Sequence, residues 1–221
     1  MSEAKPTVFV VDDDISVRRS LQLLMESAGW QSETFASGLE FLARPRVSAP
    51  SCLVLDVVLP NVNGCDLQKR IADRSDMPII FISGHGDVPV AVRAMKAGAL
   101  DFLTKPVVDD VLLMAIRKAL HHSQQQLESE AELRALRDCY ASLSRREKQV
   151  MLLVVSGMLN KQVGGELRIS EITVKAHRGR MMQKMKATSL ASLVMMASRL
   201  RLTTAGRLEG VEDRHRFNDV D

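Results

Sequence analysis

Acidic side chains end two apolar runs of this sequence, and their position gives the chain its clearest capacity for chemistry. Asp56 closes the run 52–55, whose β-branched and leucine-rich composition is typical of a strand buried on both faces. Asp12, Asp13 and Asp14 follow a second such run at 7–11, TVFVV. One aspartate at such a place can cap the next helix, so a solvated cap is the competing interpretation for Asp14. Three acidic residues are more than a cap requires.

Two further apolar runs end in polar residues that suit phosphate chemistry. The run 78–82 leads into Ser83, and the run 100–103 leads into Thr104, Lys105 and Pro106. The bond between Lys105 and Pro106 is a candidate for cis geometry, which X-Pro bonds adopt at low cost. Ligands bind at the carboxyl edge of open parallel sheets, where these strand ends would meet. We therefore expect one cluster at that edge, made of Asp12, Asp13, Asp56, Ser83 and Lys105.

Such a cluster predicts phosphoryl transfer with Mg²⁺. Carboxylates that crowd together repel one another unless a cation is present, and Mg²⁺ prefers a few carboxylate oxygens together with water and phosphate. Asp56 can act as the nucleophile and form an acyl phosphate, while the Lys105 ammonium group neutralises the moving oxygens. The Ser83 hydroxyl is suited to bond one phosphoryl oxygen.

The elements that must position these residues alternate along the chain. Helical patterns separate the four apolar runs and a weaker strand at 31–35, and this alternation predicts an α/β doubly wound, five-stranded parallel sheet. The helices are expected after Asp14 and at 39–43, 67–72, 88–97 and 109–120.

The motifs VVDDD, LVLDVVLP, IIFISGHGD and LTKP, in that order, resemble the receiver domain of bacterial two-component response regulators, over residues 5–122. The similarity is strongest to the FixJ and StyR type. It implies a flavodoxin-like strand order, 2-1-3-4-5, with Asp56 as phosphoacceptor. It also implies that Asp13 binds Mg²⁺ with Asp12 beside it, and that Val58 binds the ion through its backbone carbonyl. Ser83 and Phe102 match the switch pair of the family, although a plain core ring is the alternative for Phe102.

The charge of the chain is concentrated in one module. Residues 143–202 contain 12 lysines and arginines but 3 acidic residues, whereas the whole chain has a net charge of only +3. Such a footprint is typical of nucleic-acid binding. Helix-start signals at Ser144 with Glu147, at Asn160, at Ser170 and at Ser189 predict four helices there. Two short helices, the second rich in cations, favour a helix-turn-helix.

The motifs LSRRE, LNKQ and ISEITVKAHRGRMMQKM make residues 143–200 similar to the LuxR/NarL type of four-helix DNA-binding domain. The chain departs from that family at Arg168, where glycine is usual, and Gly164 and Gly165 lie inside the supporting helix at a cost of up to about 1 kcal/mol each. The resemblance implies DNA contacts from Lys161, Thr173, Lys175, His177, Arg178 and Arg180. The alternative for Thr173 is a bond within its own helix, and the alternative for His177 is a partly buried packing residue.

The expected organisation is a receiver domain at 1–122, a helical linker at 123–142, the helix-turn-helix domain at 143–202 and a flexible tail at 203–221. Cys52, Cys65 and Cys139 lack metal-ligand spacing and are expected to be reduced thiols. Neither a signal peptide nor a membrane span is indicated, so we expect a cytoplasmic protein.

The function predicted is that of a DNA-binding transcriptional regulator that a sensor histidine kinase activates by phosphorylating Asp56. Its expected partners are that kinase, promoter DNA, RNA polymerase and a second copy of the chain. A Mg²⁺-dependent aspartyl-phosphate phosphatase is the main alternative, but that class has an acidic residue two positions after its nucleophile, where this chain has Val58. A receiver-controlled RNA-binding antiterminator is the third possibility.

Overall fold

The computed structural model describes residues 5–60, 62–84 and 88–202, and the chain divides into two compact units, Met1–Ser129 and Glu130–Asp221. The predicted tail, 203–221, lies outside the described residues. None of the helices within the described ranges is long and apolar enough to cross a membrane.

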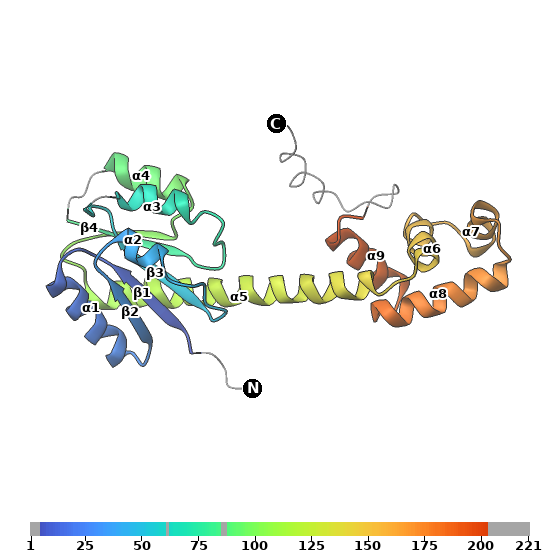
Figure 1. The fold of residues 1–221 in the computed structure, drawn as a ribbon, viewed down its shortest axis with the longest axis horizontal. Helices are drawn as coiled ribbons and strands as arrows, with labels where there is room; N and C mark the ends of the chain where they lie inside the picture. Colours follow the sequence, from blue (N-terminus) through green and yellow to red (C-terminus); the bar gives the residue numbers. More distant parts are fainter. Residues whose placement is uncertain (1–4, 61, 85–87, 203–221) are drawn as a thin grey trace, which may run out of the picture. The chain divides into compact units, whose positions relative to one another are not determined.

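The first unit is built on a parallel sheet whose five strands are ordered β2-β1-β3-β4-β5 (Figure 1), which confirms the predicted fold class and strand order. The strands are β1 (Thr7–Val11), β2 (Gln31–Phe35), β3 (Ser51–Asp56), β4 (Ile79–Ser83) and β5 (Asp101–Thr104). The helices between and after them are α1 (Ile15–Ser27), α2 (Gly38–Leu42), α3 (Gly64–Arg70), α4 (Val88–Lys96) and α5 (Asp109–Ala141).

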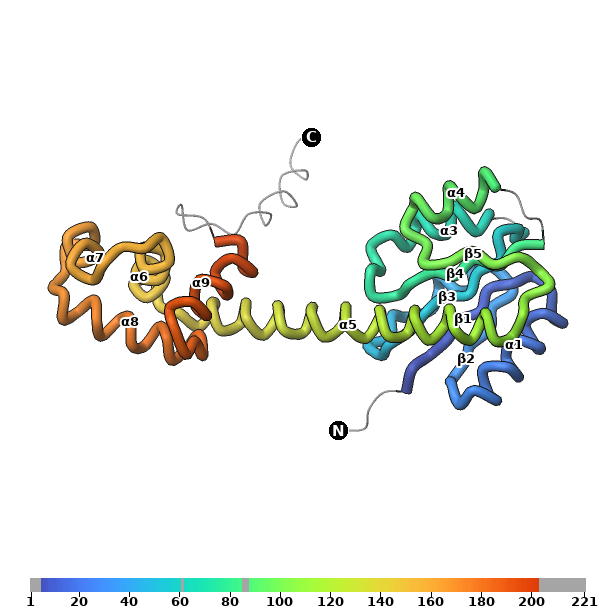
Figure 2. The backbone as a smooth tube through the Cα atoms, turned by 180° about the vertical axis from the view of Figure 1, so that it is seen from behind, coloured from blue at the N-terminus to red at the C-terminus, as the bar shows by residue number. Residues whose placement is uncertain are grey.

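Helices cover both faces of this sheet (Figure 2). One apolar cluster joins strand residues such as Phe9 and Leu53 to Phe41 of α2, Leu67 of α3 and Ala94 of α4. A second cluster joins the opposite strand faces to α1 and α5. Every residue of β1, β3 and β4 is buried, because both of their faces are covered. This double coverage explains why the strands are almost continuously apolar up to their polar ends.

Two elements differ from the predicted ranges in ways that matter for the site. Strand β3 includes Asp56, which pairs in register with Ile82, so the carboxylate belongs to the sheet itself. Helix α3 begins at Gly64, three residues before the predicted start. A Cβ atom on Gly64 would lie 2.4 Å from the carbonyl oxygen of Asp56, so only glycine permits this approach.

Helix α5 is much longer than the predicted 109–120 and continues through the range expected for the linker. The buried Ser123 hydroxyl ties it to the sheet unit by accepting from the amide of Ser51 and donating to the carbonyl of Asp76. Further along α5, Leu136 and Tyr140 pack into the core of the second unit. The three cysteines are free thiols.

The second unit contains the end of α5 and the helices α6 (Arg145–Val155), α7 (Asn160–Leu167), α8 (Glu171–Met185) and α9 (Leu190–Arg199). Its core includes Val150, Val163, Val174, Met181 and Leu193, each inaccessible to solvent. The buried methionines of this unit, Met151, Met181 and Met185, are therefore packing residues. Buried side chains from every one of these helices join a single cluster, which holds α8 against α6 and α7.

Three of the four predicted helix starts are confirmed. Ser144 and Glu147 form the capping box of α6, Ser170 accepts from the amide of Thr173, and Ser189 caps α9. The fourth is wrong, because Asn160 is the first residue of α7 and does not cap it. The Asn160 side-chain oxygen instead accepts a hydrogen bond from Arg178 of α8 (3.0 Å).

Glu147 also holds α8 in place. Its carboxylate is buried, accepts from the amide of Ser144 (2.8 Å) and pairs with the ammonium group of Lys184 (2.7 Å). These two hydrogen bonds, that from Lys184 first, hold the pKa of Glu147 below its ordinary value. The carboxylate therefore stays ionised and links the start of α6 to the end of α8.

Helix α7 and the turn that follows it contain the departures noted in the sequence. Arg168 ends α7 in the left-handed conformation (φ 54°), as expected for a position where glycine is usual. The two glycines of α7 differ in their surroundings. A Cβ on Gly164 would meet the carbonyl oxygen of Ile169 at 2.8 Å, whereas a Cβ on Gly165 would meet nothing within 4 Å.

These surroundings predict opposite effects for two similar substitutions. Gly164→Ala should lower the free energy of unfolding by about 1 to 3 kcal/mol, because the turn must move away from the new methyl group. Gly165→Ala should raise it by about 0.5 to 1 kcal/mol, because alanine favours an exposed helix interior. Urea unfolding of the two full-length variants, followed on the transition of the second unit, checks both signs. A loss of stability in Gly165→Ala would contradict the prediction.

Candidate functional site: a carboxylate cluster and a basic helix

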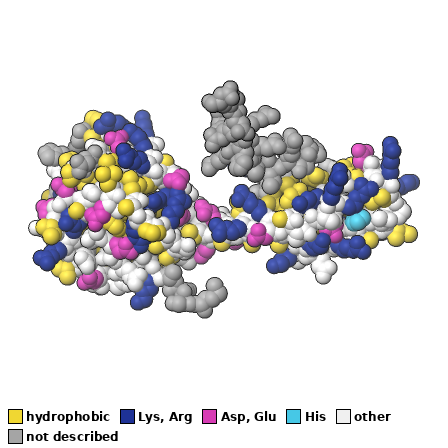
Figure 3. Space-filling view, viewed as in Figure 1, with side chains coloured by type: hydrophobic (Ala, Val, Ile, Leu, Met, Phe, Trp, Pro, Cys, Tyr) yellow, Lys and Arg dark blue, Asp and Glu magenta, His cyan; other side chains and the backbone are white. Residues whose placement is uncertain are grey.

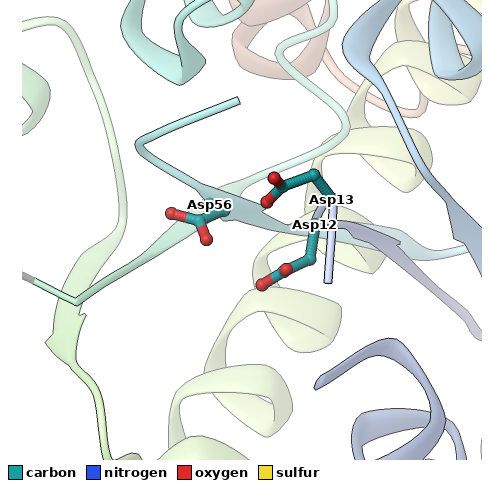
Figure 4. Close-up of side chains that lie close together, drawn as sticks. All are labelled: Asp12, Asp13 and Asp56. Carbon is teal, nitrogen blue, oxygen red and sulfur yellow. The ribbon is translucent and has the colours of Figure 1, made fainter. Parts of the chain in front are cut away.

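Three carboxylates converge at the carboxyl edge of the sheet (Figure 4). Asp12 and Asp13 follow β1, Asp56 ends β3, and one oxygen from each lies within 4.8 Å of the other two. Asp12 and Asp56 are buried, at 0% and 6% exposure, whereas Asp13 is exposed to solvent. Two buried carboxylates so close together need a positive partner.

Lys105 is that partner. It follows β5, and its Nζ atom lies 2.7 Å from Oδ2 of Asp12 and 2.5 Å from Oδ2 of Asp56. The peptide bond from Lys105 to Pro106 is cis, as predicted. The lysine ammonium group therefore bridges side chains that β1 and β3 bring to the same edge.

The remaining oxygen of each buried carboxylate orients the loop that follows its strand. Oδ1 of Asp12 accepts from the amide of Asp14 (2.9 Å), and Oδ1 of Asp56 accepts from the amide of Val58 (3.0 Å). Asp14 itself caps α1 by accepting from the amide of Ser16, so the competing interpretation as a helix cap is correct for this residue. These bonds fix both carboxylates before any ligand is bound.

Burial and pairing act on the pKa values of this cluster in opposite directions. Burial raises the pKa of Asp12 and outweighs the lowering effect of its hydrogen bond from Lys105. Burial alone would lower the pKa of Lys105, but the hydrogen bonds to Asp12 and Asp56 outweigh it, and the pKa is raised. The lysine therefore remains charged at the site.

Arg18 is a site residue that the sequence did not reveal. Its guanidinium group, one turn into α1, donates to the backbone carbonyls of Asp12 (2.7 Å) and Asp13 (2.9 Å). It thus holds the main chain of the acidic loop. The only signal was a cation four residues after Asp14, which is common on helices, and its acceptors are backbone groups that no side-chain pattern displays.

Ser83 ends β4, the strand next to β3, and Phe102 lies on β5, the strand beyond it. Ser83 is buried at the end of β4, and its carbonyl accepts from the amide of Lys105 (2.7 Å). Phe102 of β5 is paired in register with Phe81, and the two ring centroids are 6.2 Å apart. Its ring is half-buried against the apolar cluster of that sheet face. The predicted gathering of polar residues at this edge is therefore present.

The second candidate site is the outer surface of α7 and α8. Lysine and arginine side chains gather over the unit that contains these helices (Figure 3). Among the predicted DNA contacts, Lys161, Lys175 and Arg180 are exposed, whereas Thr173, His177 and Arg178 are half-buried. All six lie on these two helices.

The half-buried members have partners within the unit. The Arg178 guanidinium group donates to Asn160, and the Thr173 hydroxyl lies 2.8 Å from that of Ser170. The Nδ1 atom of His177 is buried and has no hydrogen-bond partner among the described residues. The exposed ammonium group of Lys175 forms an ion pair with Glu171 one turn earlier (3.1 Å). The three exposed cations are thus better placed for an external ligand.

The two units correspond to two known domain families. Residues 8–117 match the model of the response regulator receiver domain, and residues 141–197 match the model of bacterial regulatory proteins of the luxR family. Response regulator protein TmoT of Ectopseudomonas mendocina is 46% identical over 202 residues, which are 91% of this chain and 92% of TmoT.

Two further relatives match this chain along nearly their whole length. Transcriptional regulatory protein FixJ of Bradyrhizobium diazoefficiens is 43% identical over 197 residues, or 88% of this chain and 96% of FixJ. The low-resolution structure of response regulator StyR is 46% identical, with a TM-score of 0.80 over 89% of this chain and all of that one. The chain therefore belongs to the response regulators of the FixJ and StyR type, in which a receiver domain is joined to a LuxR-type DNA-binding domain.

Proposed function

We propose that Asp56 accepts the phosphoryl group that activates this response regulator. The observation that carries the proposal is the position of its carboxylate, buried at the end of β3 with Oδ2 bound to Lys105 and Oδ1 bound to the amide of Val58. A carboxylate held in this way presents a fixed nucleophile. Asp12 is held by equivalent bonds, but its side chain has no exposure to solvent, whereas that of Asp56 keeps 8% and is open to a phosphodonor.

Mg²⁺ fits the donor set beside this nucleophile. Asp12, Asp13 and Asp56 together offer the few carboxylate oxygens that this ion takes from proteins, and the exposed Asp13 leaves room for water. The backbone carbonyl of Val58 would be the remaining protein ligand. When bound, Mg²⁺ neutralises the oxygens of the phosphoryl group and of the carboxylates.

Lys105, Ser83 and Phe102 would convert phosphorylation into a structural signal. The ammonium group of Lys105 already lies against Asp56 and would pair with a phosphoryl oxygen on that side chain. The hydroxyl of Ser83, at the end of the neighbouring strand, would donate a hydrogen bond to another phosphoryl oxygen. A shift of Ser83 toward that oxygen would change the space beside the half-buried Phe102 ring, which would turn further inward.

The two domains make the protein a phosphorylation-activated, DNA-binding transcriptional regulator. In our proposal a sensor histidine kinase supplies the phosphoryl group, and the active form is a homodimer on promoter DNA that acts with RNA polymerase. Exposed apolar residues on α4 and α5, namely Val92, Met95, Val111 and Met114, support pairing of receiver domains.

The two other candidate functions have less support. In a phosphatase of the haloacid dehalogenase type, an acidic side chain would stand at Val58, which here is apolar and exposed. An RNA-binding antiterminator would share the receiver domain but would not need the luxR-family module that the second unit matches. The relatives are named as a response regulator protein and a transcriptional regulatory protein, and these names also favour a transcriptional regulator.

Replacing the nucleophile tests the central proposal. Parent protein incubated with acetyl phosphate and Mg²⁺ should gain one phosphoryl group, and Asp56→Asn should gain none, because an amide is not a carboxylate nucleophile. Intact-protein mass spectrometry measures both. Asp14→Asn is the matched control, because asparagine keeps the helix cap and this residue has no role in transfer. Equal labelling of Asp56→Asn and the parent would refute the assignment.

Arg18 should act as a positioning residue for this reaction. At saturating Mg²⁺, Arg18→Gln should slow phosphorylation by about tenfold, a typical loss when a group that supports metal ligands is removed. Arg18→Lys, which keeps one donor, should recover part of the rate. The neighbouring exposed residue provides the control variant, Arg19→Gln, which should react as the parent does. Initial rates from acetyl phosphate give the comparison, and a parent-like rate in Arg18→Gln would exclude this role.

Replacement of Lys175 and replacement of Arg178 should change DNA binding in different ways. Lys175→Ala should erode the preference for cognate over scrambled duplex by about 1 to 3 kcal/mol, as expected for loss of a base contact. Arg178→Ala should weaken binding to both duplexes equally and lower the salt slope by about one, as expected for loss of a phosphate contact. Titrations of the full-length protein at two salt concentrations measure both quantities.

Asn160→Ala separates charge from positioning at Arg178. This variant removes the hydrogen-bond partner of Arg178 and keeps the guanidinium charge. If Arg178 contacts phosphate, Asn160→Ala should retain the salt slope of the parent. If neither Lys175→Ala nor Arg178→Ala changed binding to either duplex, α8 would not be the DNA-reading helix.

A further inference from the structure

The outward face of α8 has an unusual composition. Val174, Met181 and Met185 form the buried seam of this helix. At 3.6 residues per turn, the face directly opposite contains Ile172, Ala176, Gly179 and Gln183, all exposed. We call these four residues the outer ridge of α8. The solvent face of such a helix normally carries charged residues, yet none of the four is charged.

Ile172 is the clearest anomaly of the ridge. It is 79% exposed, more than any other large hydrophobic side chain in the described part of the chain. It contributes nothing to the core of the unit, since it belongs to no apolar cluster there. An isolated exposed apolar residue is ordinary, but this one lies in the N-terminal half of the helix that also bears the exposed cations.

Gly179 is the second anomaly, and it is independent of the first. Glycine in a helix interior costs about 0.5 to 1 kcal/mol relative to alanine. A Cβ atom at Gly179 would meet nothing within 4 Å, so packing inside the protein does not require glycine here. Gly164 shows the contrast, because there a neighbouring carbonyl excludes a side chain. The absence of a side chain at Gly179 therefore favours close approach by an external partner.

The charges beside the ridge indicate what that partner is. Lys175 lies along one side of the ridge and Arg180 along the other, and both are exposed. The apolar N-terminal part of the ridge, with one exposed cation on each side, matches the DNA major groove, where phosphates form both walls and thymine methyl groups project from the floor. A second copy of the chain fits less well, because its identical cations would repel these. The exposed apolar residues of α9, Val194 and Met195, suit a protein partner better.

We propose that Ile172 reads the methyl group of a thymine in each half-site, and that Gly179 lets α8 lie close to the groove floor. This inference rests on the proposed DNA-binding function and deepens it, because it names the base feature that an uncharged residue recognises. Ala176, between the two, extends the same apolar part of the ridge. The protein should therefore prefer sites with thymine at one defined position.

Removal of single methyl groups from the DNA tests the contact with Ile172. The site preferred by the phosphorylated full-length protein is first selected from random duplexes, and each thymine in it is then replaced by deoxyuridine, which pairs identically but lacks the methyl group. Deoxyuridine at one position in each half-site should weaken binding of the parent protein about fourfold, which is the value for one buried methyl group. Ile172→Ala should bind the thymine and deoxyuridine duplexes equally.

Leu159→Ala is the matched control, because Leu159 is also a highly exposed apolar residue but lies outside the ridge. It should keep the full deoxyuridine penalty. A parent protein indifferent to every methyl group, or an Ile172→Ala variant that retains the penalty, would overturn the proposal. Failure of the parent to bind any duplex would instead overturn the DNA-binding function on which it rests.

Gly179→Ala gives a readout that a purely structural role would not produce. The melting temperature of the second unit should rise by a few degrees, because alanine is the better helix former. Affinity for the selected duplex should nevertheless fall at least tenfold, because the added methyl group holds the helix away from the groove floor. A variant that is more stable and binds as the parent does would show that α8 makes no such close approach.

Discussion

The contact between Lys105 and two buried carboxylates is the interaction on which the receiver domain depends. Asp12 and Asp56 end adjacent parallel strands, so the topology of the sheet places like charges side by side where water is largely excluded. Without the ammonium group, these two carboxylates would lack a compensating charge at that edge. Lys105 reaches both because β5, two strands away from β3, ends at the same edge. Binding of Mg²⁺ and a phosphoryl group would redistribute these charges, so the same ion pair that stabilises the resting site makes it responsive.

The DNA-binding unit depends on a comparable internal constraint, applied to one helix. Helix α8 is held at its start by the Ser170 cap, in its middle by the bond from Arg178 to Asn160, and at its end by the pair between Lys184 and Glu147. Its buried seam fills the core shared with the other helices. These contacts fix the rotation of α8 about its axis, and with it the residues that face outward. The contacts on the buried side of α8 therefore determine that the outer ridge faces solvent.

Most of the fold and the centre of the receiver site were predictable from the sequence, for physical reasons. A strand covered on both faces must be apolar, so a charged residue at its end, such as Asp56, is conspicuous. Features that depend on backbone contacts were not predictable. Arg18 binds carbonyl groups, and Gly64 makes room for one, so neither leaves a side-chain pattern. Asn160 was misassigned because a good capping residue can equally serve a distant partner, here Arg178. The roles proposed for the site residues stay predictions.

Both units leave a local requirement unmet by the chain alone, and this links their structures to regulation. Among the described residues, one ammonium group, that of Lys105, pairs with the cluster of three carboxylates, and α8 exposes an uncharged ridge between cations. In each unit the apolar core supplies the stability of the fold, so the unit can tolerate a site that is unfavourable until its ligand binds. A metal cation with a phosphoryl group would balance the charge of the acidic cluster. A DNA major groove, with thymine methyl groups between two walls of phosphate, would cover the outer ridge of α8. Since each unit has its own apolar core, the ligand of one site need not disturb the packing of the other. In the homodimer that we propose, phosphorylation would bring copies of the DNA-binding unit together on adjacent half-sites, without any rebuilding of α8.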